Sequence, residues 1–275
     1  MLMTPPTLWL VVLFILPLIL MAVFSFRAGS FAPERDQFTL DTYREYFSNP
    51  AYLRRLGQSG WIALQTSALS IPFAYPLAYF LAFRAGPMRV TLLTVLIVPA
   101  WTSYLLRILA WKIILGSNGA LATFLLSTGL MQEAAPVLLY SPTAVIVTLV
   151  YSWIPFVTLP IFSALERIDK RLLEAAADLG CAPWEAFLRV TLPLSLPGVI
   201  GGFFFVFIPT LGEWVTPTLV GGVQGIMYGN LIQDQFVRAL NWPMGSLMSL
   251  VMLTVVLILT VLFSRVGRIS DLAGA

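Results

Sequence analysis

Histidine is absent from the 275-residue chain, and Cys181 is its only cysteine. A disulfide needs two cysteines, and imidazole and thiolate groups are the common ligands of transition metals. The sequence therefore excludes an internal disulfide and His-based acid/base catalysis, and it predicts no metal site. Charged residues make up only 11% of the chain. Because they are not clustered as binding to a phosphate backbone requires, nucleic acid is not an expected partner.

Apolar residues, in contrast, make up 59% of the sequence, more than a soluble domain of this length carries. They come in six blocks, each near the roughly 18 to 25 residues that a helix needs to cross a bilayer. The blocks are Leu8–Phe26, Gly60–Phe83, Val90–Trp111, Thr143–Phe162, Pro197–Leu211 with an extension toward Val220, and Gly245–Phe263. The sequence predicts an all-α integral membrane protein with about six transmembrane helices in one domain, residues 1–275. The first block lacks a preceding basic region, so we expect a retained helix rather than a cleaved signal peptide.

The short link between the second and third blocks contains Arg84 and Arg89. Arginine in short loops favours the cytoplasmic side of a membrane, so both termini are expected in the cytoplasm. The segment 27–57 then lies outside and the segment 166–196 inside. A count of basic residues over all loops gives almost the same number on both sides of the membrane, because the outer segment also contains five arginines. We therefore base the orientation on the short link with two arginines.

The outer segment also contains acidic residues and is expected to fold. Asp41 is placed to cap a helix at its N-terminus. The intermittent apolar face of this helix would consist of Leu40, Tyr43, Phe47 and Leu53. We expect the helix to lie on the membrane surface.

The inner segment 166–196 is longer and more charged than a turn between two helices requires. Asp169 is a plausible N-cap for a short helix that Gly180 ends in a left-handed conformation. A second short helix is predicted to begin with Pro183 in its first turn and to stop before Pro193. Two helices joined at a glycine form a bent, protruding element that suits docking of another protein.

On the first of these helices, Leu172, Ala176 and Leu179 share one face. The alanines would let a partner approach the backbone closely, and Glu174 offers a charge to an arginine of that partner. Taken alone, Glu174-Ala175-Ala176 is more often ordinary helix chemistry than a docking motif. The longer pattern around it is more specific.

This pattern consists of Glu174-Ala175-Ala176, three residues, Gly180, nine residues, and then Val190-Thr191-Leu192-Pro193. It resembles the "EAA" loop of bacterial binding-protein-dependent ABC importer permeases, with Val190 where isoleucine is common. The resemblance implies a type I ABC importer permease fold, with a cytoplasmic coupling helix between the fourth and fifth spans. It assigns ATPase docking to Glu174, Ala175, Ala176, Gly180, Leu172, Leu179 and Pro193.

Further segments resemble the PotB-like branch of polyamine (spermidine/putrescine) permeases. They are Phe38–Asp41 with Tyr43, Tyr75–Ala82, Val98–Arg107, and Leu211–Pro217 with Gly221-Gly222. The resemblance implies a non-catalytic subunit of the bacterial inner membrane, in contact with lipid. Its partners would be two ABC ATPase subunits, a second homologous permease, and a periplasmic or lipid-anchored substrate-binding protein. The chain contains no Gly-x-x-x-x-Gly-Lys-Ser/Thr loop, so ATP and Mg would be bound by the ATPase partners and no cofactor by this chain.

Ionisable residues within membrane spans are candidates for function. A cationic amine would favour carboxylates and aromatic faces, which makes Glu213, Asp234, Trp101, Tyr104 and Trp214 candidates for the substrate path, with Arg107 beside them. Each has an alternative structural interpretation. Trp and Tyr also occupy membrane interfaces, and an arginine near a helix end can reach lipid headgroups.

The sequence also allows two other classes of protein, and it allows several substrates for an importer. A membrane enzyme would need a polar catalytic constellation, and the spans contain none that is convincing. An ion channel or a secondary transporter would need no ATPase, but it would leave the structured inner segment unexplained. Related importers also carry other small amines, amino-acid derivatives and opines, and the permease pair could be homodimeric.

Overall fold

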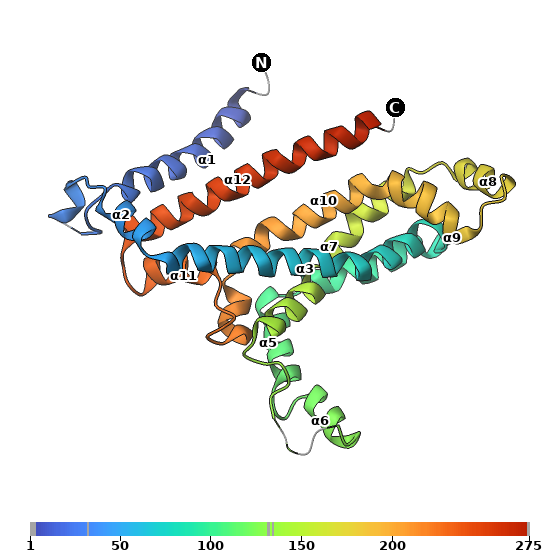
Figure 1. Ribbon diagram of the computed structural model, residues 1–275, viewed down its shortest axis with the longest axis horizontal. Helices are drawn as coiled ribbons and strands as arrows, with labels where there is room; N and C mark the ends of the chain where they lie inside the picture. Colours follow the sequence, from blue (N-terminus) through green and yellow to red (C-terminus); the bar gives the residue numbers. More distant parts are fainter. Residues whose placement is uncertain (1–3, 32, 131–132, 134, 274–275) are drawn as a thin grey trace. The chain divides into compact units, whose positions relative to one another are not determined.

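The computed structural model describes residues 4–31, 33–130, 133 and 135–273. Within these ranges the chain is helical, and the only β-type pairing is an isolated bridge between Arg27 and Phe38. The prediction of an all-α protein is confirmed (Figure 1). The chain divides into two units, one made of Met1–Gln58 with Met227–Ala275 and the other of Ser59–Ile226. The long helix α3 (Pro50–Phe83) begins in the first unit and continues in the second.

The first unit contains the two chain ends. Its elements are α1 (Thr4–Ser25), η1 (Glu34–Asp36), α2 (Asp41–Ser48), the first residues of α3, α11 (Tyr228–Val237) and α12 (Trp242–Ala273). Helix α1 packs along α12. A buried cluster of Tyr46, Tyr228, Met244, Leu247 and Met248 joins α2, α11 and α12. The segment 27–48 is thereby attached to the last membrane helix.

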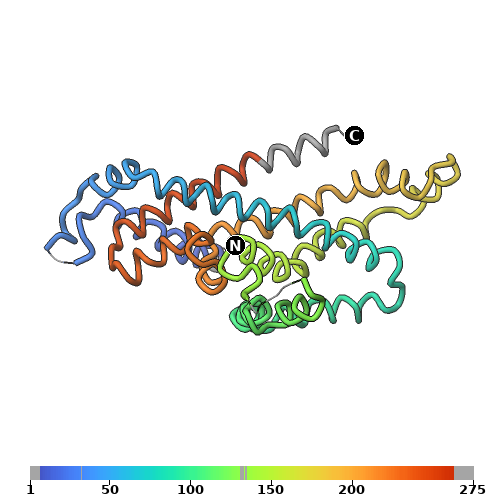
Figure 2. Tube along the Cα trace, turned by 60° about the horizontal axis from the view of Figure 1, so that its bottom comes forward, coloured from blue at the N-terminus to red at the C-terminus, as the bar shows by residue number. Residues whose placement is uncertain are grey.

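The second unit is centred on two helices, α7 (Pro142–Glu166) and α10 (Leu192–Leu211), which run side by side (Figures 1 and 2). Its other elements are α3 from Ser59 onward, η2 (Gly86–Met88), α4 (Arg89–Ile97), η3 (Val98–Trp101), α5 (Tyr104–Leu115), α6 (Ala120–Ser127), α8 (Lys170–Asp178), α9 (Pro183–Ala186), η4 (Phe187–Thr191) and η5 (Pro217–Gly221). A buried core includes Ala74 and Ala78 of α3, Val157 and Ile161 of α7, and Val206 of α10.

In the part of the chain that the structure describes, six helical stretches are long and apolar enough to cross a membrane. They are Thr7–Ser25, Pro50–Phe83, Tyr104–Ser127, Pro142–Glu166, Pro183–Leu211 and Trp242–Leu262. The predicted number of spans is confirmed. The first, fourth and sixth agree in position with the predicted blocks. The second and fifth begin ten and fourteen residues earlier than expected, at Pro50 instead of Gly60 and at Pro183 instead of Pro197.

The early start of α3 has a local cause. The Asn49 side chain accepts a hydrogen bond from the backbone N–H of Ala51 at 3.0 Å. Pro50 then occupies the first helical position, where its fixed φ angle fits and no N–H is needed. The polar stretch before the apolar block is therefore helical, and Leu53 lies on α3 rather than on the predicted surface helix.

The surface helix itself forms as α2, but the prediction that Asp41 caps it is wrong. Leu40 occupies the N-cap position, and Asp41 is the first helical residue. The Asp41 carboxylate instead accepts a hydrogen bond from the Thr39 hydroxyl at 2.7 Å and pairs with Arg44 at 3.4 Å. For Asp41 to be the N-cap, the helix would have to begin at residue 42, one residue later than it does.

The predicted third span, Val90–Trp111, is not one helix. Helical geometry stops after Trp101, and Thr102 and Ser103 adopt ψ angles of 159° and 124° before α5 begins. The Thr102 hydroxyl donates to the carbonyl of Pro99 at 2.6 Å, which satisfies a group that would otherwise bond within a continuing helix. The apolar run is therefore divided into a shorter helix, Gly86–Trp101, and the candidate span Tyr104–Ser127.

Candidate functional site

The segment between α7 and α10 forms the bent element that the sequence predicts. Asp169 caps α8, since its carboxylate accepts a hydrogen bond from the backbone N–H of Arg171 at 3.0 Å. At the other end Gly180 has a φ angle of +82°. The N–H of Gly180 bonds to the carbonyl of Ala177 at 2.9 Å, and the N–H of Cys181 bonds to that of Ala176 at 3.0 Å. This pair of bonds is the Schellman arrangement, which requires a left-handed residue at Gly180.

The exposed side of α8 differs in one residue from the predicted face. Leu172 and Leu179 are 48% and 85% exposed, and Glu174 and Ala175 are also exposed. Ala176, in contrast, is 7% exposed, and its helix packs against α9 and η4 of the same chain. Its small side chain therefore permits a close approach within this chain. The prediction that it lies on the open face with Leu172 and Leu179 is wrong.

The sequence predicted that the helix after Gly180 stops before Pro193. This prediction is wrong. It starts at Pro183, where the Glu185 carboxylate accepts a hydrogen bond from the N–H of Ala182 at 3.1 Å, and it continues to Leu211. A proline inside a helix removes one backbone bond and crowds the carbonyl four residues before it. Here the residues before Pro193 form the π-helix η4, Phe187–Thr191, whose wider turn absorbs that defect. The segment 166–196, called the docking segment below, is thus continuous with the fifth span. Figure 1 shows its helices α8 and α9 at one end of α7 and α10.

A second polar group lies where η5 approaches α5. One carboxylate oxygen of Glu213 accepts hydrogen bonds from the backbone N–H groups of Trp214, Val215 and Thr216 at 3.1, 2.8 and 3.1 Å. The other accepts from the Tyr104 hydroxyl at 2.8 Å, and that hydroxyl also lies 2.8 Å from the Thr216 hydroxyl. The carboxylate therefore caps the helical turn that follows it and attaches this turn to α5.

The other candidates for the substrate path lie on several elements. The Arg107 guanidinium carbon lies 5.7 Å from the centre of the Tyr104 ring. Trp101 and Trp214 are 83% and 43% exposed. Asp234 belongs to the other unit, on α11, where it pairs with Arg238 at 3.3 Å.

The structure thus brings Tyr104, Arg107 and Glu213 together through the Tyr104 side chain. Sequence reasoning missed Thr216 and the capping role of Glu213. An acidic residue just before a helical turn that contains Pro217 was the available signal. Contact between these side chains and a substrate stays a prediction. In the described part of the chain, no three His, Cys, Asp or Glu side chains lie close enough together to hold a metal ion.

Comparison with known proteins places these observations in a family. A family model described as "binding-protein-dependent transport system inner membrane component" matches residues 1–272. The spermidine/putrescine transport system permease protein PotB of Escherichia coli K12 is 36% identical over 262 residues, covering 95% of this chain and 94% of the relative. The inner membrane ABC transporter permease protein YdcU of the same organism is 31% identical over 247 residues, covering 86% and 78%.

Solved structures agree on the fold. One chain of a bacterial alginate ABC transporter in complex with alginate pentasaccharide-bound periplasmic protein has a TM-score of 0.77 and 15% sequence identity, covering 98% of this chain and 93% of that one. A chain of the MetNI methionine ABC transporter in an inward-facing conformation has a TM-score of 0.59 and 17% identity, covering 79% and 95%. The architecture is that of the type I ABC importer permeases, and the chain belongs to the family of binding-protein-dependent transport system inner membrane components.

Proposed function

We propose that this chain is a permease subunit of an ATP-driven importer that carries a polyamine, spermidine or putrescine, or a related small amine. The observation that carries the proposal is the 36% identity to PotB, which extends over almost the full length of both chains. Similarity of this extent includes the membrane helices that a substrate must pass as well as the docking segment. A second candidate is the same type of importer for another small solute, such as an amino-acid derivative or an opine.

The docking segment indicates which subunits of the importer would bind ATP and which would form the membrane pathway. Two ABC ATPase subunits would bind ATP and Mg and would dock on α8 through Leu172, Glu174, Ala175 and Leu179. Gly180 sets the direction of the chain there, while Ala176 and Pro193 support the docking helix from within the chain. This assignment is supported by the exposure of two leucines and a carboxylate on a short helix attached to the fifth span. A second homologous permease would complete the membrane pathway, and a periplasmic or lipid-anchored binding protein would deliver the substrate.

The orientation in the bacterial inner membrane follows from the same assignment. Docking to a cytoplasmic ATPase requires the segment 166–196 to lie inside, and an even number of spans then places both termini in the cytoplasm. The segment 27–57 would face the binding protein. Arg84 and Arg89, which flank the short link between α3 and α4, would lie on the cytoplasmic side and agree with this orientation.

Transport would proceed by alternating access. Closure of the ATPase pair would move α8, and the continuous helix Pro183–Leu211 would carry that movement to the level of Glu213. The side chains of Trp101, Tyr104, Arg107, Glu213, Trp214 and Asp234 are the proposed contacts along the path. For a cationic amine, the two carboxylates and the aromatic faces would be attractive.

The test is transport by the reconstituted complex. The chain is purified with its co-encoded partners, placed in proteoliposomes, and supplied with labelled spermidine or putrescine and the binding protein. We expect uptake that requires both ATP and the binding protein. Uptake only of another competing solute would keep the importer class and replace the substrate. Transport by this chain in the absence of any ATPase would contradict the proposal and favour a secondary transporter.

A further inference from the structure

An apolar groove of about 460 Å³ opens on one side of the second unit. It lies between α3, the helix Gly86–Trp101, and α7, with the start of α5 at one end. Several of its side chains are strongly exposed, including Leu77 at 42%, Phe80 at 49% and Val95 at 63%. The volume is in the range of roughly 300 to 1,000 Å³ that is typical of small-molecule sites.

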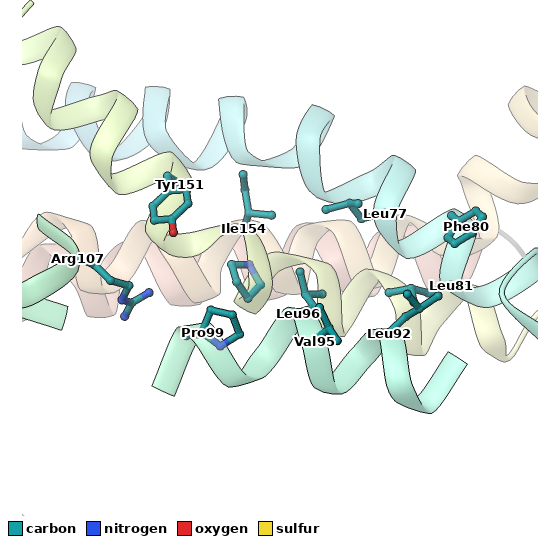
Figure 3. Close-up of a pocket in the computed structure, with 12 residues that line it drawn as sticks. Leu77, Phe80, Leu81, Leu92, Val95, Leu96, Pro99, Arg107, Tyr151 and Ile154 are labelled. Carbon is teal, nitrogen blue, oxygen red and sulfur yellow. The ribbon is translucent and has the colours of Figure 1, made fainter. Parts of the chain in front are cut away.

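The groove has a marked chemical asymmetry along its length. Leu92 and Leu96 and their neighbours make its walls hydrocarbon, and among the described residues that line it Arg107 is the only charged one. Figure 3 shows Arg107 at one end, near Pro99, and Phe80 and Leu92 at the opposite end. A molecule that fills this groove would therefore place an apolar chain along α4 and an anionic group at Arg107.

Arg107 forms no ion pair with a described residue, since no carboxylate among them lies within 4.0 Å of its guanidinium. Its buried Nε atom also has no hydrogen-bond partner among them. Its contact with Tyr104 is a ring face, and Tyr104 already donates its hydroxyl proton to Glu213. Leaving a buried donor unbonded costs on the order of 1–3 kcal/mol, so a bound acceptor at this position would be favourable.

We propose that this groove is a binding site for a membrane phospholipid, with one acyl chain along Leu77, Val95 and Leu96 and the headgroup phosphate at Arg107. A guanidinium binds phosphate through two parallel N–H donors, which gives both affinity and orientation. The site lies on membrane-spanning helices, where phospholipid is the abundant amphiphile with this distribution of charge. A cationic amine does not suit it, since the only charge in the groove is positive.

This proposal assigns Arg107 to a lipid in place of the substrate path, and it does not depend on which solute the protein transports. A lipid wedged between α3 and α4 would fill the space beside the break at Thr102 and Ser103, where the apolar run changes direction between two helices. Its phosphate would also accept hydrogen bonds from the Arg107 guanidinium, so that Glu213 would not be needed as a partner of Arg107. An occupant of this kind is a structural part of the permease rather than its cargo.

The test uses the assembled complex in nanodiscs that contain phosphatidylglycerol with a photoreactive group in the acyl chain. After irradiation, labelled peptides are mapped by mass spectrometry. We expect labelling of the segment that contains Leu92, Val95 and Leu96. Arg107→Gln should reduce this labelling roughly tenfold, since a hydrogen bond to a charged group accounts for about a factor of ten in binding. Arg107→Lys should retain part of it.

A second variant fills the groove without changing its charge. Leu96→Trp should displace the acyl chain and abolish labelling of this segment, while Val11→Trp, an exposed position on α1, should leave it unchanged. Arg44→Gln is the matched control for loss of an exposed arginine. Labelling that is absent from the groove, or that neither Arg107→Gln nor Leu96→Trp reduces, would overturn the proposal. So would a cross-link from Val95→Cys to another subunit, because that subunit would then cover the groove.

Discussion

The Nη1 atom of Arg89 lies 2.6 Å from a carboxylate oxygen of Glu166. Arg89 is the first residue of α4, and Glu166 is the last residue of α7 and the first of the docking segment. The guanidinium also lies over the ring of Phe162, 5.7 Å from its centre. This ion pair therefore attaches the base of the docking segment to the helix that follows the short arginine-containing link.

We expect Arg89→Gln to lower the amount of solute transported per ATP hydrolysed while changing stability little. The two side chains are 39% and 43% exposed, so the pair contributes at most about 1 kcal/mol. Loss of the attachment would instead let the base of the docking segment move without α4. ATP hydrolysis and uptake are measured together in proteoliposomes.

The combination Arg89→Glu with Glu166→Arg should restore the ratio of transport to hydrolysis toward its original value. Arg84→Gln, which removes an exposed arginine of the same link without breaking an ion pair between described residues, serves as the control and should change nothing. A combined variant that performs no better than either single change would show that the ion pair has no part in coupling.

The turn at Gly180 predicts a contrast between two substitutions. The φ angle of +82° is strained for residues with a side chain, although a Cβ added there would meet no atom within 4 Å. Any effect must therefore come from the backbone. Gly180→Val should distort the turn and reduce ATPase docking and transport several-fold, whereas Gly180→Asn should retain most of both, because asparagine tolerates this conformation. Co-purification of the ATPase with each variant is the measurement, and equal loss in both would contradict a backbone role.

The docking segment was predictable because its determinants are local. Asp169 caps a helix within two residues of itself, and Gly180 ends the helix through bonds that reach back no more than five residues. The orientation of α8 was not predictable in the same way. Which residue of the helix becomes buried depends on its packing against α9 and η4, and the periodicity of α8 alone does not distinguish Ala176 from Leu172.

The errors in the spans have a related cause. Hydropathy is continuous across Thr102 and Ser103, and the break depends on one hydroxyl that bonds to the carbonyl of Pro99. The start of α3 depends similarly on the side chain of Asn49. Glu213 was identified as a candidate, but its partner Tyr104 is 109 positions away in the sequence, and only the fold brings them together.

The role of Glu213 can be separated from its structural bonds by two variants. Tyr104→Phe removes the hydroxyl that donates to the carboxylate and retains the negative charge, while Glu213→Gln removes the charge. If the charge attracts a cationic amine, Glu213→Gln should raise the KM for uptake several-fold more than Tyr104→Phe. Size-exclusion profiles check that both variants assemble. Equal kinetics in two assembled variants would remove Glu213 from the substrate path.

A buried tyrosine pair in the first unit predicts a dependence of stability on pH. The hydroxyls of Tyr46 and Tyr228 lie 2.9 Å apart, and burial raises the pKa of both above the ordinary value of 10.0. The folded state therefore holds these protons at a pH at which the unfolded state releases them. The stabilisation is present below about pH 10 and is lost as the pH rises toward the raised values.

We expect the thermal unfolding midpoint of the complex to fall between about pH 9.5 and 11, with a shallower decline in the combined variant Tyr46→Phe with Tyr228→Phe. Tyr228→Phe alone should lower the unfolding midpoint more than Tyr46→Phe alone does. The first leaves the Tyr46 hydroxyl buried without its partner, whereas the second leaves Tyr228 its bond to the Met248 carbonyl. An identical pH profile in the combined variant would contradict this account.

The contact between α7 and α10 predicts opposite effects for two neighbouring glycines. A Cβ at Gly198 would lie 2.5 Å from the Ala164 Cβ and 2.6 Å from the Pro160 carbonyl oxygen. Since neither atom belongs to the end of a flexible side chain, Gly198→Ala must separate the two helices. At Gly201 the nearest atom is the Pro160 Cβ at 3.9 Å, an ordinary contact distance.

Gly198→Ala should therefore destabilise the protein by about 1–3 kcal/mol, the usual cost of overpacking a core. Gly201→Ala should be neutral or stabilise it by up to about 1 kcal/mol, because alanine favours a helix more than glycine does. Thermal unfolding of the two purified variants under identical conditions provides the comparison. Because both changes add the same methyl group to the same helix, a similar shift in both would mean that α7 and α10 do not approach each other as closely as these distances require.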